Sequence, residues 1–377
     1  MEDIRGEGGP HRQNTTLAQR RDDSHESPFQ FKFHSLAAMS ELEAQSLFGT
    51  EREAALALYR RFTEQELTQT ALRNVDDDFL ALQALILFLT VNRMLGEVDI
   101  AWMLTGLAKR SSILQRTDLP PFQLEIQKRM AWQLWYLDHR AGKDHGQHDG
   151  PPRTPSVDPP TNMNDPDFGP TSSFLPVSSL GWTEQTFALA RFDIGITRNE
   201  LTKAMPLDKK RQTIEECQQR ITRKYIKYCT DDQNAVQWLT RHVSHVLIME
   251  MWFELYSADT IPISLQQVGA GVYHEQTFQD HLFLQAIDIV DTSTRLHTEP
   301  LSRRWKWLLK GYQQFRPLAF LINELLYRKK CAAVSHAWTI VKNALDQQPT
   351  QVRDSVNGKA LDALKAKARD TQDRIGD

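Results

Sequence analysis

Residues 120–146 read PPFQLEIQKRMAWQLWYLDHRAGKDHG, and this stretch decides the fold class. Pro120 and Pro121 suit the first turn of a helix, where the missing N–H of proline has no partner to lose. Apolar side chains then recur at helical spacing and aromatic ones widen the same face: Ile126, Met130, Leu134 and Leu137, with Trp132, Trp135 and Tyr136. The pattern predicts a long helix that buries Trp135 and Leu137 and ends near Gly142.

The same helical period runs through most of the chain. The most apolar run, FLALQALILFLTV at 79–91, predicts a buried helix. Apolar stripes with helical spacing occur at Ala55, Leu58, Tyr59 and Phe62, at Ile214, Cys217, Ile221, Tyr225 and Tyr228, and along 233–256, 274–298, 301–326 and 331–346. No segment alternates with a period of two. We therefore predict an all-α, multi-helix fold of about ten or more helices.

One irregular segment interrupts these helices. Eight of the 17 prolines lie between Gly142 and Gly181, and this stretch, 142–181, has no helical period, which predicts an extended crossover. Neither half of the chain could cover its apolar faces alone, so we expect one helical domain over residues 29–347. Residues 1–28 are polar and predict a disordered leader, and residues 348–377 predict a polar C-terminal tail.

Composition and charge exclude several classes of protein. A net charge of −3 gives no general affinity for nucleic acid or for an acidic surface. The run at 79–91 is too short for a membrane span, which needs roughly 20 apolar residues, and the N-terminus lacks the apolar stretch of a signal peptide. Cys217, Cys229 and Cys331 lack paired metal-ligand spacing, and their odd number favours a reducing compartment.

The end of the helix at 120–146 raises the question of a catalytic or metal site. Asp138 lies at the edge of the apolar stripe, where a carboxylate could be a general base or could be held by an arginine and by loop amides. We favour the structural role, in which Asp138 and Arg140 fasten the helix end to the crossover. Side chains of zinc-ligand type also gather here: His139, Asp144, His145 and His148. Three of them, Asp144, His145 and His148, follow Gly142 in the irregular segment, so we expect no zinc site.

Other polar groups have structural explanations as well. His242 and His245 lie one helical turn apart near Glu250 and Glu254, but H-E-x-x-H is absent and the neighbouring residues are apolar. The sequence NMNDPDF at 162–168 lacks the central glycine and the final glutamate of a calcium loop, which favours Asx turns.

Two further stretches have glycine-rich or basic character without the pattern of a binding site. VGAGVY at 268–273 lacks the glycine spacing of a phosphate-binding loop. In RRWKWLLKGYQQFR at 303–316 we expect Trp305, Leu308 and Tyr312 to face the core and Lys306 and Lys310 to face water, with binding to a nucleic-acid backbone as the alternative. The sequence predicts no catalytic, cofactor-binding or metal-ligating residue.

Four stretches together resemble a known family: AWMLTGLAKR (101–110), IQKRMAWQLWYLDHRAGKDHG (126–146), PTNMNDPDF (160–168) and WTEQTFALARFDI (182–194). Their order and spacing are similar to the regulatory middle-homology domain of fungal zinc-cluster transcription factors. In that family a tryptophan-rich helix ending in Leu-Asp-x-Arg precedes a loop rich in Asn and Asp and then a Thr-Glu-x-x-Phe helix. The resemblance covers about residues 31–345 and implies an α-helical regulatory domain without catalytic residues or cofactors.

Two departures from the family pattern bear on function. The six-cysteine zinc cluster that binds DNA in the family has no counterpart here, because no cysteine precedes Cys217. We therefore expect the chain to begin inside the regulatory domain, at FQFKFHSLAAMS (29–40), and to bind no specific DNA sequence. In addition, SSILQRTDLPPFQ at 111–123 replaces a Gly-Leu-His-x-Asp-Gly turn that is usual in the family.

The resemblance implies a transcription-regulator-like protein that controls a specialised-metabolite gene cluster. Its partners would be proteins of the transcription machinery or a DNA-binding homologue, together with a small-molecule effector and no membrane. The expected compartment is the nucleus, with the cytoplasm as the alternative. The alternative functions are a small-molecule-binding or enzymatic protein on the same helical scaffold, and an inactive truncated relative.

Overall fold

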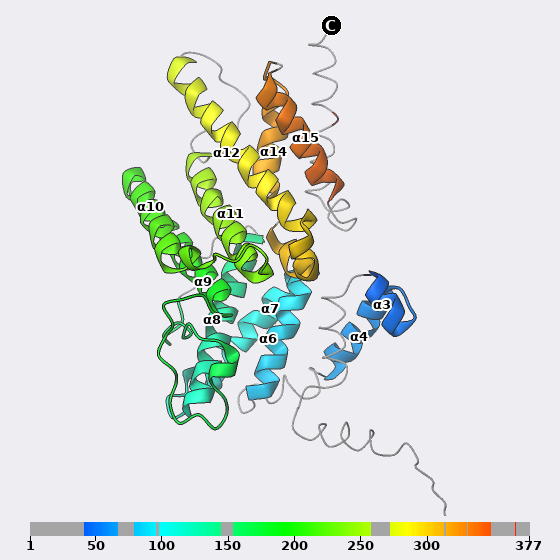
Figure 1. Cartoon of the computed structure of the whole chain (residues 1–377), viewed down its shortest axis with the longest axis vertical. Coiled ribbons are helices and arrows are strands. Elements are labelled where there is room, and N and C mark those ends of the chain that lie inside the picture. Colours follow the sequence, from blue (N-terminus) through cyan, green and yellow to red (C-terminus); the bar gives the residue numbers. More distant parts are fainter. Residues whose placement is uncertain are drawn as a thin grey trace, which may run out of the picture.

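The computed structural model of the chain describes residues 41–66, 79–95, 98–144, 154–257, 272–312, 314–329, 331–347 and 366. Within these ranges it has twelve α-helices, five short 3₁₀-helices and no strand, which confirms the predicted all-α fold (Figure 1). The predicted leader and nearly all of the predicted tail lie outside the described residues, as do His145, His148 and residues 268–271. The single domain over 29–347 stays a prediction.

The first group of helices surrounds the apolar run at 79–91. It comprises α3 (Glu41–Phe48), α4 (Arg52–Glu66), α6 (Phe79–Met94), α7 (Val98–Ala108), η2 (Ser112–Gln115) and α8 (Pro121–Asp144). Leu82, Leu85 and Leu89 on α6 are fully buried, as the sequence predicts. The apolar stripe predicted on α4 is confirmed only in part. Ala55 is buried, but Leu58 is 50% exposed, because the side of α4 that packs into the core carries Ala55 and Leu56.

Helix α8 has apolar side chains on two sides. Met130, Leu134 and Leu137 join the core cluster formed with α6. Trp132, Trp135 and Tyr136 join a second cluster, formed with the helices that follow the crossover. The helix begins at Pro121 as predicted, but it continues past Gly142 to Asp144.

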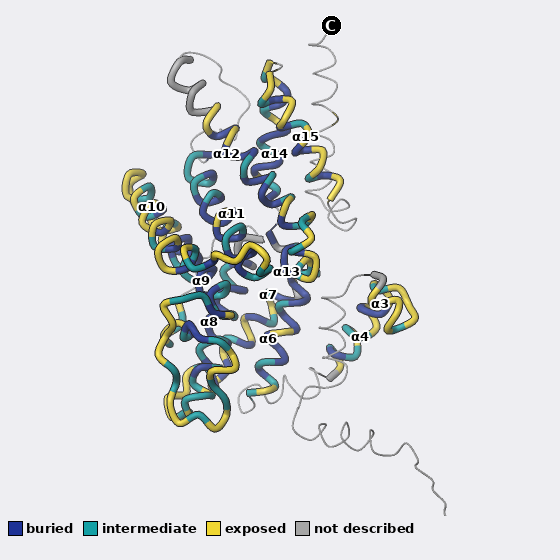
Figure 2. The backbone as a smooth tube through the Cα atoms, in the orientation of Figure 1, coloured by how far each residue is buried: buried dark blue, intermediate teal, exposed yellow. Residues whose placement is uncertain are grey.

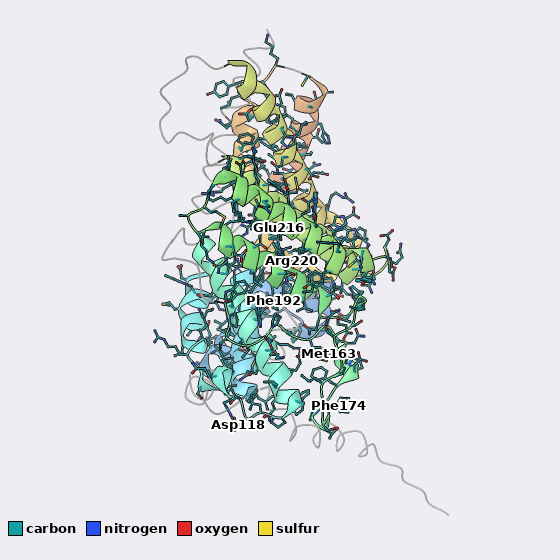
Figure 3. The ribbon with its side chains drawn as sticks, turned by 90° about the vertical axis from the view of Figure 1, so that its left-hand side faces the viewer. Asp118, Met163, Phe174, Phe192, Glu216 and Arg220 are labelled. Carbon is teal, nitrogen blue, oxygen red and sulfur yellow. The ribbon has the colours of Figure 1, made fainter. Side chains whose placement is uncertain are left out.

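The second group begins within the crossover, and its helices pack on the tryptophan side of α8. It comprises η3 (Asp165–Asp167), α9 (Thr186–Leu201), α10 (Leu207–Lys224), η4 (Ile226–Tyr228) and α11 (Ala235–Ser257). Ile214, Cys217 and Ile221 form the buried stripe of α10, as predicted, while its outer side is exposed (Figure 2). Phe192 lies inside the molecule, whereas Phe174 of the crossover lies at its edge (Figure 3).

The third group forms the other end of the molecule (Figure 1). It comprises α12 (Val272–Thr298), η5 (Pro300–Trp305), α13 (Lys306–Leu309), η6 (Lys310–Tyr312), α14 (Phe315–Glu324) and α15 (Ala332–Asp346). The prediction of one helical run over 301–326 is wrong, because the structure divides this stretch into η5, α13, η6 and α14. Pro317 has no N–H to bond to a preceding turn, so α14 starts afresh two residues before it.

The two lysines of the 303–316 stretch, Lys306 and Lys310, differ in their exposure to solvent. Leu308 and Tyr312 are buried, as expected. Lys306 is exposed, but Lys310 is only partly so, and burial together with the neighbouring Arg52 lowers the pKa of its amine. The expectation that Lys310 faces water is therefore wrong. No helix among the described residues combines the length and apolar character required to cross a bilayer.

Candidate functional site

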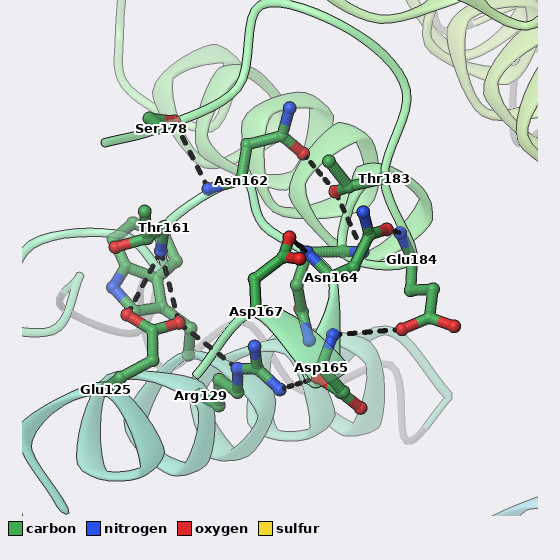
Figure 4. A network of polar contacts seen from close by, with 12 residues as sticks. Glu125, Arg129, Thr161, Asn162, Asn164, Asp165, Asp167, Ser178, Thr183 and Glu184 are labelled. Atoms are coloured by element: carbon green, nitrogen blue, oxygen red, sulfur yellow. Dashed lines mark hydrogen bonds and ion pairs between the residues drawn. The ribbon is translucent and has the colours of Figure 1, made fainter. Parts of the chain in front are cut away.

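The crossover is fastened to α8 and α9 by a network of polar contacts (Figure 4). Asn162 is the centre of this network: its amide donates to the carbonyls of Ser179 (2.8 Å) and Gly181 (2.9 Å), and its Oδ1 accepts from Thr183 (2.6 Å) and Thr186 (3.2 Å). All of its hydrogen-bonding capacity on the side chain is used within the protein. This arrangement explains the buried asparagine without any ligand.

A second part of the network uses acids of the crossover and of α8. The fully buried Glu125 accepts from the backbone N–H of Thr161 (3.2 Å) and from Nε of Arg129 (3.1 Å). Arg129 also reaches Asp165 (2.6 Å), and the Asn164 and Asp167 side chains cap η3 reciprocally. The backbone N–H of Asn164 donates to Oδ2 of Asp167 (3.1 Å), a contact three residues apart, so the Asx turns predicted for 162–168 stay a prediction.

The aromatic side of α8 also holds the crossover. The indole N–H of Trp132 donates to the carbonyls of Val157 (3.1 Å) and Asp158 (3.0 Å). Its ring packs edge-on against Trp135, with centroids 5.4 Å apart. Trp135 is 1% exposed and Leu137 is 3% exposed, which confirms that both are core positions.

Asp138 contacts a different partner from the one the sequence suggested. Its Oδ2 lies 2.5 Å from Nζ of Lys109, directly after α7, and both side chains are partly exposed. The prediction that Asp138 is held by an arginine and by loop amides is wrong, because α8 continues beyond Gly142 and its free backbone groups come later. Asp138 therefore joins α7 to α8 rather than α8 to the crossover.

Arg140 turns into the core, where a cluster of arginine and tyrosine side chains lies between α8, α9 and η6. Its guanidinium is 5.3 Å from the ring centroid of Tyr312. The expected link from Arg140 to the crossover stays a prediction. Arg191 of α9 donates from Nη1 to the Tyr312 hydroxyl (3.3 Å) and lies over the rings of Tyr136 (4.8 Å) and Phe187 (4.5 Å). The hydroxyls of Tyr136 and Tyr312 are 3.3 Å apart.

The charges of this arginine–tyrosine cluster shift the pKa values of its two phenols, Tyr136 and Tyr312, in opposite directions. Burial raises the pKa of Tyr136, with the neighbouring Tyr312 adding to the effect. Burial would also raise the pKa of Tyr312, but the Arg191 and Arg140 guanidinium groups outweigh it and lower that pKa below the ordinary value of a tyrosine. Tyr312 is thus the group that best accepts negative charge beside the buried arginines.

Arg191 is a buried residue of this cluster that the sequence pattern did not single out. A signal for it exists in TFALARFDIGITRNEL, where Arg191 and Arg198 lie seven residues apart and therefore on the same face of the helix. Arg198 is the better paired of the two, since it binds Glu250 (2.8 Å), Glu254 (3.1 Å) and the carbonyl of Leu247 (3.2 Å).

The candidate metal ligands His242 and His245 of α11 each have another partner. Nδ1 of His242 contacts the carbonyl of Trp238 at 2.8 Å and its ring stacks on that indole, while burial lowers the pKa of His242. Nε2 of His245 lies 2.7 Å from Asp288. The described residues contain no group of three or more His, Cys, Asp or Glu side chains placed to hold a metal ion.

The described surface has one hollow along α10 and another between α12, α14 and α15. The larger, about 480 Å³, runs along the exposed polar side of α10 between Glu215 and Arg223. The smaller, about 40 Å³ and open to solvent on one side, lies between α12, α14 and α15. Only the smaller one is lined by side chains whose buried polar atoms lack a partner within the described ranges.

The chain is similar to several curated transcription factors of fungi. It is 27% identical to the aurofusarin cluster transcription factor aurR2 of Gibberella zeae, over 85% of this chain and 49% of that protein. It is 25% identical to the C6 finger domain transcription factor nscR of Arthroderma benhamiae, over 84% and 46%. It is 24% identical to the pyriculol/pyriculariol biosynthesis cluster transcription factor 1 of Pyricularia oryzae, over 88% and 47%.

Comparison with known protein families gives no match, and no solved structure matches the chain. The chain spans about half the length of the curated relatives that it matches. The resemblance indicated by the four sequence stretches is confirmed: over most of its length this helical chain is similar to zinc-cluster transcription factors of fungi.

Proposed function

We propose that the chain is a transcription-regulator-like protein for a fungal biosynthetic gene cluster. The observation that carries this proposal is the similarity to relatives named for the aurofusarin and pyriculol/pyriculariol clusters, which extends over 85% and 88% of the chain. A similarity that continues through all three helical groups favours a shared regulatory scaffold over one short common motif.

The proposed mechanism is non-catalytic. A signal received by the helical scaffold would favour one packing of its helices over another and so change the surface offered to protein partners. The arginine–tyrosine cluster suits such a role, because Arg140, Arg191 and Tyr312 come from three different elements and meet in a buried place. The partners we propose are proteins of the transcription machinery or a DNA-binding homologue, and the proposed compartment is the nucleus.

The test is a deletion of the gene in its source organism, with measurement of transcripts from neighbouring biosynthetic genes. We expect these transcripts to change several-fold and to return when the parent gene is restored. Restoration with Tyr312→Phe, which removes one buried hydroxyl, should give an altered response. Val177→Ala in the crossover is the matched control, since Val177 is 93% exposed. Transcripts that do not respond to the deletion would refute the proposal.

The alternative function is small-molecule binding without control of transcription. The observation in its favour is the small hollow between α12, α14 and α15, with its unpartnered polar atoms. Binding to the purified chain combined with unresponsive transcripts would select this alternative.

A further inference from the structure

The small cavity between α12, α14 and α15 has both apolar and polar walls. Val290, Phe315 and Leu318 are among its apolar lining residues, and Ser293, His297 and Gln314 are among its polar ones. Its volume of about 40 Å³ exceeds the roughly 10–15 Å³ that one water molecule needs. Figure 1 shows the three helices side by side at one end of the molecule. The cavity can therefore admit the end of a molecule larger than water.

Two buried polar atoms at this cavity lack a hydrogen-bond partner in the described part of the chain. They are Oε1 of Gln314 and Nε2 of His297. Gln314 is only 7% exposed, so bulk water does not solvate its amide freely. A buried polar atom without a partner loses its hydration with nothing in return, so two of them in one cavity point to a group that binds there.

The contacts around the cavity define the chemistry of that group. Nε2 of Gln314 donates to the Tyr312 carbonyl (3.2 Å), which leaves its oxygen in need of a donor. The Ser293 hydroxyl donates to the same carbonyl (3.1 Å), so its oxygen can still accept. A carboxylate has no hydrogen to give to Gln314, whereas a hydroxyl both donates and accepts.

Charge disfavours a cationic ligand. Burial, together with the positive charges of Lys306 and Lys310, lowers the pKa of His297 to about 4. The imidazole is therefore neutral at physiological pH, and it faces positive rather than negative neighbours. An ammonium group entering this cavity would meet the same repulsion.

We propose that this cavity binds the hydroxyl end of an uncharged small molecule. The hydroxyl donates to Oε1 of Gln314 and contacts Nε2 of His297, and the apolar part of the molecule lies against Val290, Phe315 and Leu318. We further assign this cavity as the effector site of the regulator. That assignment rests on the proposed function, whereas the binding itself does not.

Tyr312 connects this cavity with the arginine–tyrosine cluster. Its carbonyl accepts the hydrogen bonds of Ser293 and Gln314, while its hydroxyl meets Tyr136 and Arg191, each at 3.3 Å. A ligand that moves Gln314 therefore acts on a residue whose other end lies between α8 and α9. This provides a direct physical route from the cavity to the centre of the fold.

The binding test compares phenol with fluorobenzene, which has a ring of similar size and no hydrogen-bond donor. The full chain is labelled with ¹⁵N-histidine, and the His297 ring signal is assigned from the His297→Gln variant. We expect phenol to shift this signal saturably and fluorobenzene to bind at least tenfold more weakly. Gln314→Met should weaken phenol binding at least tenfold. Gln285→Met is the matched control, because Gln285 is a buried glutamine of α12 outside the cavity whose oxygen also lacks a partner.

Several outcomes would overturn the proposal. Phenol could give no saturable shift, or phenol and fluorobenzene could give equal shifts. Gln314→Met and Gln285→Met could also weaken phenol binding equally. Each of these outcomes would mean that the cavity holds ordered water only. If Gln314→Met does not fold, the comparison of the two probes on the parent chain tests the same hydrogen bond. Phenol binding with unresponsive transcripts would refute the proposed function alone, and responsive transcripts without binding would refute the cavity assignment alone.

Discussion

Gly195 of α9 lies so close to Trp135 of α8 that a methyl group would press on the indole ring. A Cβ atom at Gly195 would lie 3.0 Å from Cη2 and 3.2 Å from Cζ3 of Trp135. The indole has little room to retreat, since Trp135 is 1% exposed and contacts both Trp132 and the stacked ring of His139. We predict that Gly195→Ala is unfavourable as long as Trp135 is present.

The magnitude follows from two opposing effects. Alanine in place of glycine stabilises a helix interior by about 1 kcal/mol. Overpacking a core costs about 1–3 kcal/mol, so Gly195→Ala should destabilise the parent by up to about 2 kcal/mol. In a Trp135→Phe background the far edge of the indole is gone, and the same substitution should instead stabilise by about 1 kcal/mol.

The assay is urea unfolding of the parent, the two single variants and the double variant. The coupling free energy between the two sites should be about 1–3 kcal/mol. Gly106→Ala in α7 is the matched control, because a Cβ atom there would meet nothing within 4 Å and should stabilise both backgrounds equally. If Gly195→Ala has the same effect in both backgrounds, the close approach of α8 and α9 is not as described.

Three further predictions concern the other sites. Asp138→Asn should lower the unfolding free energy by less than about 1 kcal/mol, because its contact with Lys109 is partly exposed, and a much larger loss in urea unfolding would contradict this. Lowering the pH from 7 toward 4 should destabilise the chain. The pKa of His297 is about 4 in the fold and ordinary when unfolded, so the unfolded state takes up the proton first and stability falls by up to about 1.4 kcal/mol per pH unit between the two values. The stability–pH curve should be flatter for His297→Gln, and equal slopes for both proteins would count against it. The purified chain should contain no stoichiometric zinc by elemental analysis and give no footprint on promoter DNA at physiological salt; one zinc per chain would overturn this expectation.

The parts of the fold set by local spacing were predictable. The start of α8 at Pro121 and the buried faces of α6 and α10 follow from proline geometry and helical period, which depend on neighbouring residues alone. The half-exposed Leu58 shows the limit of this reasoning. Its spacing from Ala55 fits a common face, yet burial depends on which side of α4 another helix covers.

The partners of the polar side chains were not predictable in the same way. Asp138 was correctly placed at the edge of an apolar stripe, but its partner Lys109 lies 29 residues earlier and reaches it only because α7 packs against α8. Tyr312 and Arg191 are 121 residues apart in the sequence. Contacts of this kind depend on the tertiary arrangement, which no local pattern encodes.

The division of α8 between two core clusters has a consequence for how the molecule unfolds. Helix α8 supplies Leu134 to one cluster and Trp135 to the next, and α11 likewise supplies Met251 to the second cluster and Phe253 to the third. The three clusters are thus linked by shared helices, since α12 also supplies Leu296 to the second cluster and Val290 to the third. Amide protons in the turns of α8, α11 and α12 that lie between two clusters should therefore exchange with solvent only when both clusters open, which makes these turns the slowest-exchanging segments and the source of cooperativity along the chain.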